Sequence, residues 1–418
     1  MSQKINSNTF VSSCLCGESE VRTLPPTAAP VPLRSLIRAL VESVGGDRSE
    51  ELFRDEIKKY FKAKNVFLLS SGKGALYVAL AALQQVSNRT VIIIPAYSSF
   101  CLASAAARSG LHVKLCDIDP KTLDFDLDIL ERLADERTLA VIPVHNHGLA
   151  CNMEAIRERV SGNGVYIIED AAQAAGATIE RQKLGLAGDL GILSFGRGKN
   201  FCALGGGAIV TNDDTLASII GNLIQKLTKP SKSSEATLCL TGTALGILLQ
   251  PKRYAIPSAL PFLHLGANVF DQGFKVSHLP LISAGVGRRT LAELDHENEI
   301  RIHNAFFYRN SLLSNPDLLI PSGPPEAYSV YLRFPVLFKR KEDRERILLL
   351  LTKEKLGASR SYPTPLDQIP GFRKSLIGEC KIPHARWVAD RILTLPTHRY
   401  VREEDRARIV QLIKEALK

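Results

Sequence analysis

Short apolar runs recur along the first half of the chain, and turn residues end most of them. Runs of four or five mostly apolar residues bounded in this way are typical of buried strands. Helix-like stretches lie between most of the runs, such as Ala75–Gln85, Leu102–Ser109 and Ile129–Ala134. Buried strands that alternate with helices predict an α/β fold, with a mainly parallel seven-stranded sheet flanked by helices. The seven runs are Val66–Leu69, Val91–Ile94, His112–Cys116, Ala140–Val144, Val165–Ile168, Ile192–Phe195 and Ala208–Thr211.

The pattern changes in the last third of the chain. From Ala292 onward it reads as a helix, then short strands around Tyr328–Leu337, then more helices. This order predicts a smaller α+β C-terminal domain over residues 292–418, beside a large domain over 33–291. Residues 1–32 are expected to form an N-terminal tail, because "TLPPTAAPVP" is proline-rich and favours extended chain.

An apolar segment, Leu238–Gly266, stands apart from the strand and helix pattern. Three prolines and the charges of Lys252 and Arg253 interrupt it, so its longest unbroken run is too short to span a bilayer. Two interpretations stay open. The segment forms a buried loop or subunit interface, or it provides a peripheral membrane contact or an apolar substrate wall.

Composition narrows the function classes. The 418 residues are 45% hydrophobic and 23% charged, which excludes wholesale disorder. The net charge of +10 is spread along the chain without zinc-finger spacing or an aromatic-interleaved basic stripe, so we expect no nucleic-acid partner. The surplus of positive charge would suit an anionic substrate, such as a nucleotide, or an acidic membrane surface. Eight cysteines show no disulfide or metal pattern and no signal peptide is evident, so we expect a cytoplasmic protein without a metal site.

Polar residues follow three of the predicted strands. Ser70–Gly74, "SSGKG", precedes a helix, where free backbone N–H groups can bind phosphate, although helix capping alone explains such a sequence. Asp170 follows another strand and could pair with a pyridinium nitrogen, or cap the next helix. Gln173 lies one turn later and could reach the substituents of such a ring.

Lys199 follows the strand that ends near Ser194, in the stretch "GRGKN". A lysine there can form a Schiff base with a cofactor aldehyde and then serve as a general base. A loop lysine is more often a solvated charge. The succession of a phosphate loop, an aspartate and a lysine at strand ends favours the catalytic interpretation, because open α/β sheets bind ligands at that edge.

This order of motifs resembles the fold-type I pyridoxal-phosphate enzymes, and more closely the DegT/DnrJ/StrS sugar aminotransferase family. The likeness covers most of the chain from about Glu50. It is carried by Ser71–Leu76, Pro95–Tyr97, Asp117–Asp126, Ile142–Gly148, Ile168–Ala177, Gly188–Phe195, Lys199–Asn200, Gly205–Asp213, Tyr362–Phe372 and Ala389–His398.

The resemblance implies a homodimeric enzyme, with its active site at the subunit interface, that uses pyridoxal 5'-phosphate. Such enzymes move an amino group, typically from glutamate, to a nucleotide-linked keto sugar in amino-sugar and polysaccharide biosynthesis. The resemblance makes Lys199 the Schiff-base lysine and Asp170 the partner of the pyridine nitrogen. Gln173 would lie beside the ring hydroxyl. The phosphate would be held by Ser71, Gly72, Lys73 and Ser194.

The chain departs from the family pattern around the phosphate. Lys73 stands where relatives usually have threonine, and a lysine could bind phosphate as a point charge. The stretch Asp271–Ser277, "DQGFKVS", places Gly273 and Lys275 where relatives have an asparagine and an arginine. The asparagine in relatives reaches the phosphate of the partner subunit. We therefore expect Lys73 to compensate for that contact.

Other departures concern the ring and the substrate. Ser99 falls at the ring-stacking position, so Phe100 is expected to substitute. The alternatives are that Tyr97 substitutes or that the stacking is lost. Ser361 and Asp367 stand where histidines are common, which points to a different substrate choice. His145 and His147 lack further ligands. They are interpreted as wall or turn residues rather than metal ligands.

The leading hypothesis is therefore a pyridoxal-phosphate-dependent aminotransferase. A sugar dehydratase of the same family is the first alternative, although such relatives typically lack the lysine that Lys199 represents. The second alternative is a non-catalytic, membrane-associated binding protein that keeps the fold. This second alternative is supported by the departures from the family's sequence pattern and by the apolar segment Leu238–Gly266.

Overall fold

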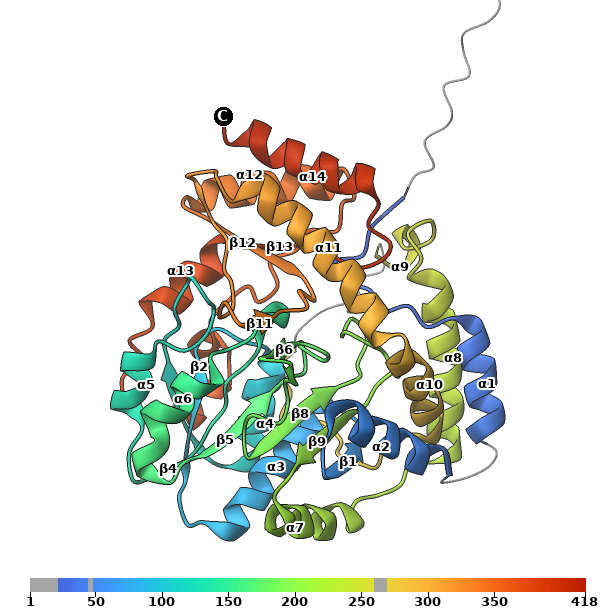
Figure 1. Cartoon of the computed structure of the whole chain (residues 1–418), viewed down its shortest axis with the longest axis vertical. Coiled ribbons are helices and arrows are strands. Elements are labelled where there is room, and N and C mark those ends of the chain that lie inside the picture. Colours follow the sequence, from blue (N-terminus) through green and yellow to red (C-terminus); the bar gives the residue numbers. More distant parts are fainter. Residues whose placement is uncertain (1–21, 44–47, 259–268) are drawn as a thin grey trace, which may run out of the picture.

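The computed structural model describes residues 22–43, 48–258 and 269–418, and a seven-stranded sheet lies at its centre (Figure 1). The strand order is β1-β9-β8-β5-β4-β2-β3. Only β9 runs against its two neighbours, so the sheet is mainly parallel, as predicted. The strands are β1 (Asn65–Leu69), β2 (Val91–Pro95), β3 (His112–Cys116), β4 (Thr138–Val141), β5 (Tyr166–Asp170), β8 (Leu190–Ser194) and β9 (Gly207–Thr211).

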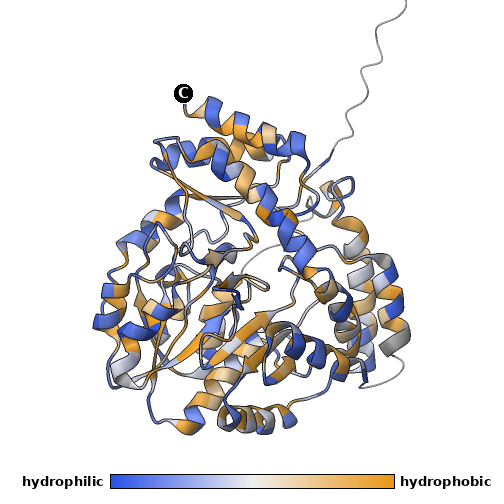
Figure 2. Cartoon of the chain, in the orientation of Figure 1, coloured by the Kyte–Doolittle hydropathy of each residue, from blue (hydrophilic) through white to orange (hydrophobic). Residues whose placement is uncertain are grey.

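Adjacent residues in most of these strands belong to different hydrophobic cores, which explains the unbroken apolar runs. Ile92 and Ile94 join the core under one set of helices, whereas Ile93 joins the core on the opposite face. Ile192 and Leu193 likewise pack into cores on opposite faces of the sheet. A strand covered on both faces gains from apolar residues at every position. The strands are correspondingly orange in Figure 2, while blue patches mark the outer helices.

Helices cover both faces of this sheet. One face carries α3 (Gly72–Val86), α4 (Phe100–Ser109) and α7 (Asp214–Gln225). The other face carries α2 (Arg48–Phe61), α5 (Leu127–Leu133) and α6 (Met153–Val160). In α3, alanine and leucine dominate and eight residues are buried, so the helix packs closely against β8 and β9. The predicted α/β class is confirmed.

Most of the C-terminal part lies at the top of Figure 1. Its side chains form a separate small core. It is built on an antiparallel sheet of order β10-β12-β13. A second small sheet joins β11 (Ala327–Tyr328) to β6 (Thr178–Ile179) and β7 (Gln182–Lys183). The other elements are α10 (Leu281–Ala292), α11 (Leu294–Leu312), β10 (Leu318–Leu319), β12 (Phe334–Phe338), α12 (Lys341–Lys353), α13 (Pro383–Arg391), β13 (Ile392–Leu395) and α14 (Glu403–Ala416).

The N-terminal lead-in packs onto the folded chain from residue 22. Leu24 and Ala28 are buried, and the hydroxyl of Thr27 donates to the carbonyl of Gly198 at 3.0 Å. Residues 1–21, with Cys14 and Cys16, lie outside the described residues. The lead-in continues into α1 (Leu33–Ser43), which packs against α10 and α8 (Lys232–Leu248).

The apolar segment that was predicted over 238–266 is partly described. It contributes most of α8 (Lys232–Leu248) and the short α9 (Ala255–Ser258), and its residues 259–266 lie outside the described part. Within the described chain, no helix combines the length and the apolar character needed to cross a bilayer. Leu240, Ile247 and Ile256 are exposed on these two helices.

Candidate active site

Strand direction brings the three polar motifs to one edge of the sheet. β5 and β8 are parallel, and β9 runs against both β8 and β1, so β1 points the same way as β8. The carboxyl ends of β1, β5 and β8 therefore share an edge. Ser71, Asp170 and Ser194 come at these ends, which is the edge where open α/β sheets bind ligands.

Asp170 is the last residue of β5, and its backbone is held on both sides. Its N–H donates to the carbonyl of Pro143 at 2.9 Å, and its carbonyl accepts from the N–H of His145 at 3.2 Å. Its carboxylate accepts from the N–H of Ala172 at 3.0 Å. Turns rather than a helix follow β5, so Asp170 does not cap a helix, which had been the alternative interpretation.

Lys199 and Asp170 influence each other electrostatically. Burial lowers the pKa of Lys199, and attraction from Asp170 opposes that shift. Burial raises the pKa of Asp170, and Lys199 opposes the rise. Lys199 is half-buried rather than a solvated loop cation. A lowered pKa increases the neutral fraction of the amine, which is the form that acts as nucleophile or general base.

The "GRG" that precedes the lysine has a conformational reason. Gly198 has a φ of +77°, in the left-handed region that favours glycine. A Cβ atom at Gly198 would also lie 2.7 Å from the side chain of Thr27. The lead-in therefore presses against the turn that positions Lys199.

The helix start at α3 forms a narrow cradle with the end of β8. Ser71 is the N-cap, and its hydroxyl accepts from the N–H of Gly74 at 3.0 Å. A Cβ atom at Gly72 would lie 2.9 Å from the Cβ of Ser194. Ser71 thus caps the helix, while the first-turn N–H groups and the helix dipole still favour an anion at this point.

A Gly72→Ala substitution is expected to weaken binding of pyridoxal phosphate about tenfold while the protein stays folded, because the new methyl group pushes against Ser194 and narrows the cradle. Titration of the cofactor by visible absorbance measures the effect. The matched control is Gly205→Ala, where the nearest atom to an added Cβ is 4.0 Å away. Equal cofactor affinity in the two variants would show that Gly72 does not border the phosphate.

Gln173 is fixed from two sides in a buried aromatic cluster. Its Nε2 donates to the hydroxyl of Tyr362 at 2.9 Å, and its Oε1 accepts from the N–H of His147 at 3.2 Å. The rings of Tyr97 and His147 lie 5.5 Å and 5.8 Å from the ring of Tyr362. The sequence reasoning passed over Tyr362, although it sits between Ser361 and Asp367 in a motif that had been singled out.

Lys73 and Phe100, which were predicted to bind the phosphate and to stack on the ring, make contacts with other parts of the chain. The Nζ of Lys73 lies 3.6 Å from the carboxylate of Asp271 and 4.8 Å from the ring centre of Phe274. Lys73 thus contacts the segment Asp271–Ser277, whose altered residues it was expected to offset. Phe100 begins α4 and is half-buried. The roles of Lys73 in phosphate binding and of Phe100 in stacking stay predictions.

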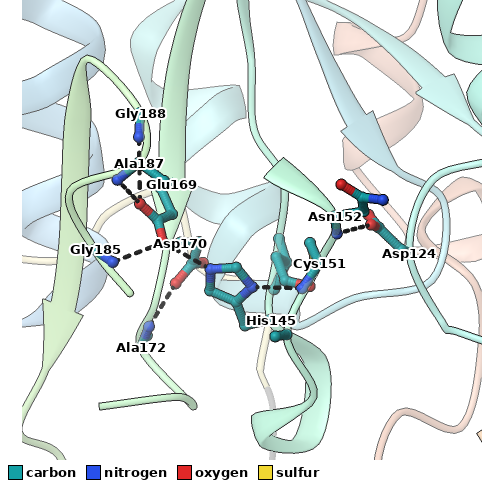
Figure 3. Close-up of polar contacts among 12 residues, drawn as sticks. Asp124, His145, Cys151, Asn152, Glu169, Asp170, Ala172, Gly185, Ala187 and Gly188 are labelled. Carbon is teal, nitrogen blue, oxygen red and sulfur yellow. Dashed lines mark hydrogen bonds and ion pairs between the residues drawn. The ribbon is translucent and has the colours of Figure 1, made fainter. Parts of the chain in front are cut away.

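A buried hydrogen-bond network anchors the end of β5 (Figure 3). Nδ1 of His145 accepts from the N–H of Cys151 at 2.9 Å, so the proton is on Nε2, which donates to Glu169 at 2.9 Å. The Glu169 carboxylate also accepts from three backbone N–H groups. These belong to Gly185, Ala187 and Gly188. The network holds the residue that precedes Asp170.

A Glu169→Gln substitution is expected to destabilise the fold by about 3 kcal/mol, because a buried amide faces N–H donors that the carboxylate now satisfies. Urea unfolding measures the change. Glu154→Gln serves as the control, because Glu154 is exposed on α6. A loss as small as that of the control would contradict a structural role for the Glu169 network.

Comparisons with known proteins agree with this geometry. Residues 40–414 match the DegT/DnrJ/EryC1/StrS aminotransferase family. The "Pleiotropic regulatory protein" of Geobacillus stearothermophilus is 30% identical over 88% of this chain and 89% of its own length. The dTDP-3-amino-3,4,6-trideoxy-alpha-D-glucose transaminase of Streptomyces venezuelae is 27% identical over 87% of this chain and 86% of its own length.

Solved structures show the same fold. DesV of S. venezuelae superposes with a TM-score of 0.74 at 24% identity, covering 93% of this chain and 99% of its own. A GDP-4-keto-6-deoxymannose-3-dehydratase superposes with a TM-score of 0.75 at 20% identity, covering 94% of this chain and 100% of its own. The chain belongs to the DegT/DnrJ/EryC1/StrS aminotransferase family, whose aminotransferases depend on pyridoxal phosphate, as its strand-end motifs predicted.

Proposed function

We propose that this protein is a pyridoxal-phosphate-dependent aminotransferase that moves an amino group from an amino acid, glutamate by resemblance, to a keto sugar carried on a nucleotide. The observation that carries the proposal is the electrostatic coupling of Asp170 with Lys199 at the sheet edge where Ser71 caps α3. The transaminase of S. venezuelae, among the relatives, supports this substrate class.

The residues present fit the cofactor. Its phosphate requires an anion site, which the first turn of α3 and Ser194 provide, and the absence of a side chain at Gly72 leaves the room. Its ring nitrogen requires an anionic partner, and its aldehyde requires an amine; Asp170 and Lys199 supply them. When bound, the cofactor supplies an electron sink for cleavage of the C–H bond of an amino acid.

The side chains around this site divide the work. The carboxylate of Asp170, oriented by the N–H of Ala172, holds a proton on the ring nitrogen. Lys199 takes a proton at the α-carbon of the donor and returns one at the acceptor, a role its lowered pKa favours. Gln173, whose Nε2 donates to the hydroxyl of Tyr362, would lie beside the ring hydroxyl of the cofactor.

The test is a pair of assays on the purified protein. Added pyridoxal phosphate is expected to give a visible absorbance band that glutamate shifts, and the amino group is then expected on a nucleotide-linked keto sugar, identified by mass spectrometry. Protein that ignores the cofactor would contradict the proposal. A product that lost a hydroxyl without gaining nitrogen would establish the dehydratase, and a protein that binds the sugar without converting it would establish the binding protein.

The assembly and the compartment belong to the same proposal. The resemblance favours a homodimer in which Asp271–Ser277 faces the partner. All six described cysteines are free, which favours a reducing, cytoplasmic location. Sedimentation analysis measures the oligomeric state directly.

A further inference from the structure

Arg333 is a cation of the site whose partners are neutral. It immediately precedes β12, and its guanidinium donates to the hydroxyl of Ser359 at 3.2 Å. The groups that raise its pKa against the effect of burial are three tyrosines, Tyr362, Tyr97 and Tyr254, and burial raises the pKa of each of these hydroxyls, which keeps them neutral. Within the described parts of the chain, no carboxylate comes within ion-pair distance of this guanidinium.

Unpaired polar atoms lie beside this arginine. Both ring nitrogens of His147 are buried and have no hydrogen-bond partner among the described residues, and the buried hydroxyl of Tyr97 has no side-chain partner there. The backbone N–H of Arg333 donates to the carbonyl of His147 at 3.4 Å, and the ring of Tyr97 lies 6.5 Å from that of His147, so both residues are neighbours of Arg333. Buried polar groups are almost always paired in folded proteins, so unpaired groups at one place indicate a missing ligand.

Among the described groups that act on the pKa of Arg333, no anionic side chain balances its positive charge. Burial lowers the pKa of Arg333, and burial with the repulsion of Arg333 lowers the pKa of His147 to about 3. Arg333 and Lys199 also repel each other. The Arg333 side chain is half-buried. A guanidinium partly removed from water is stabilised by an anion of matching geometry, and a planar carboxylate can accept from two of its N–H groups side by side.

We propose that Arg333 binds a carboxylate of the amino donor, with the Tyr97 hydroxyl and the His147 ring as further hydrogen-bond partners. This rests on the proposed function. In an α-amino acid the carboxylate carbon is two bonds from the amino nitrogen, so a donor that reacts beside Lys199 carries its carboxylate into the neighbourhood of Arg333. In a nucleotide sugar, the sugar ring separates the diphosphate from the reacting carbonyl. The diphosphate is therefore placed farther from Lys199 than the carboxylate of the donor, and Arg333 is assigned to that carboxylate.

The probe is glutarate, a dicarboxylate with the carbon chain of glutamate and no amino group to react. Its affinity for the cofactor-loaded enzyme is measured by calorimetry in the wild type, Arg333→Gln and Arg333→Lys. We expect Arg333→Gln to raise the Kd about 100-fold, because charge-assisted, paired hydrogen bonds are lost. Arg333→Lys is expected to lose less affinity for glutarate, because lysine keeps the positive charge but lacks the two parallel N–H donors of the guanidinium. Affinity for the cofactor is expected to stay unchanged.

The matched control is Arg360→Gln, an exposed arginine next to Ser359 that pairs with Glu345. A second probe, a nucleoside diphosphate, is expected to bind all variants equally. An unchanged glutarate Kd in Arg333→Gln, no binding of glutarate by the wild type, or loss of nucleotide binding in place of glutarate would overturn the assignment. Arg333→Lys provides the same comparison where Arg333→Gln does not fold.

Failure of the proposed function has a different signature. In that case the wild type itself shows no shift of the cofactor band with any amino acid. Failure of the Arg333 assignment alone leaves that shift intact, with the KM for glutamate in Arg333→Gln equal to that of Arg360→Gln.

Discussion

Replacing Lys199 with alanine is expected to lower amino-group transfer about 10⁴-fold or more while the protein keeps its fold and its phosphate site. The lysine is both the attachment point for the cofactor aldehyde and the base that moves the proton, and general-base catalysis alone contributes about 10²–10⁴-fold. Asp170 is the group that attracts the Lys199 ammonium. Loss of the amine therefore leaves a site that binds the cofactor without turning over.

Two quantities are measured: the glutamate-dependent absorbance shift in a single turnover, which is expected to be lost, and the steady-state rate of amino-group transfer to the sugar. Lys374→Ala is the matched control, because Lys374 is exposed away from the cradle. Added methylamine is expected to restore a small part of the rate in Lys199→Ala, since a free amine can replace the missing base. A Lys199→Ala variant with a tenth of the wild-type rate would contradict the assignment.

An Asp170→Asn substitution is expected to lower the transfer rate about 10³-fold, since a preorganised charge at such a site contributes roughly 3–4 kcal/mol. The amide keeps the shape of the side chain but does not hold a proton on the ring nitrogen. It also loses the attraction that raises the pKa of Lys199. We therefore expect the pKa of the lysine to fall further in the variant.

Single-turnover rates and the pH dependence of the cofactor band measure both effects. The control is Asp128→Asn, because Asp128 is an exposed aspartate on the first turn of α5 that pairs with Arg159. Asp170 Oδ1 accepts from one backbone N–H, so unfolding is measured alongside to separate a catalytic loss from a structural one. Transfer within threefold of the wild type would contradict the role of Asp170.

The central sheet could be predicted because its signal is local. Each strand is buried on both faces, so a short apolar run bounded by turn residues marks it without knowledge of its neighbours. Ile92–Ile94 shows this, since adjacent residues serve opposite cores. The predicted strands of this sheet differ from the observed ones only at their ends. For example, β4 begins and ends earlier than the apolar run Ala140–Val144 suggested.

The grouping of Ser71, Asp170 and Ser194 could also be predicted, because strands that point the same way end at one edge. Arg333 and Tyr362 could not. They come from the C-terminal part and reach the site through packing of distant elements, which no local pattern encodes. The pairing of His145 with Glu169 was missed for a related reason, since it joins the loop after β4 to β5.

The most direct test of the central claim is chemical trapping of the cofactor. The protein loaded with pyridoxal phosphate is reduced with borohydride, digested, and analysed by mass spectrometry. The account predicts that the reduced cofactor is found on the peptide that contains Lys199, and that Lys199→Ala gives no labelled peptide. Label on another lysine, or none in the wild type, would contradict it.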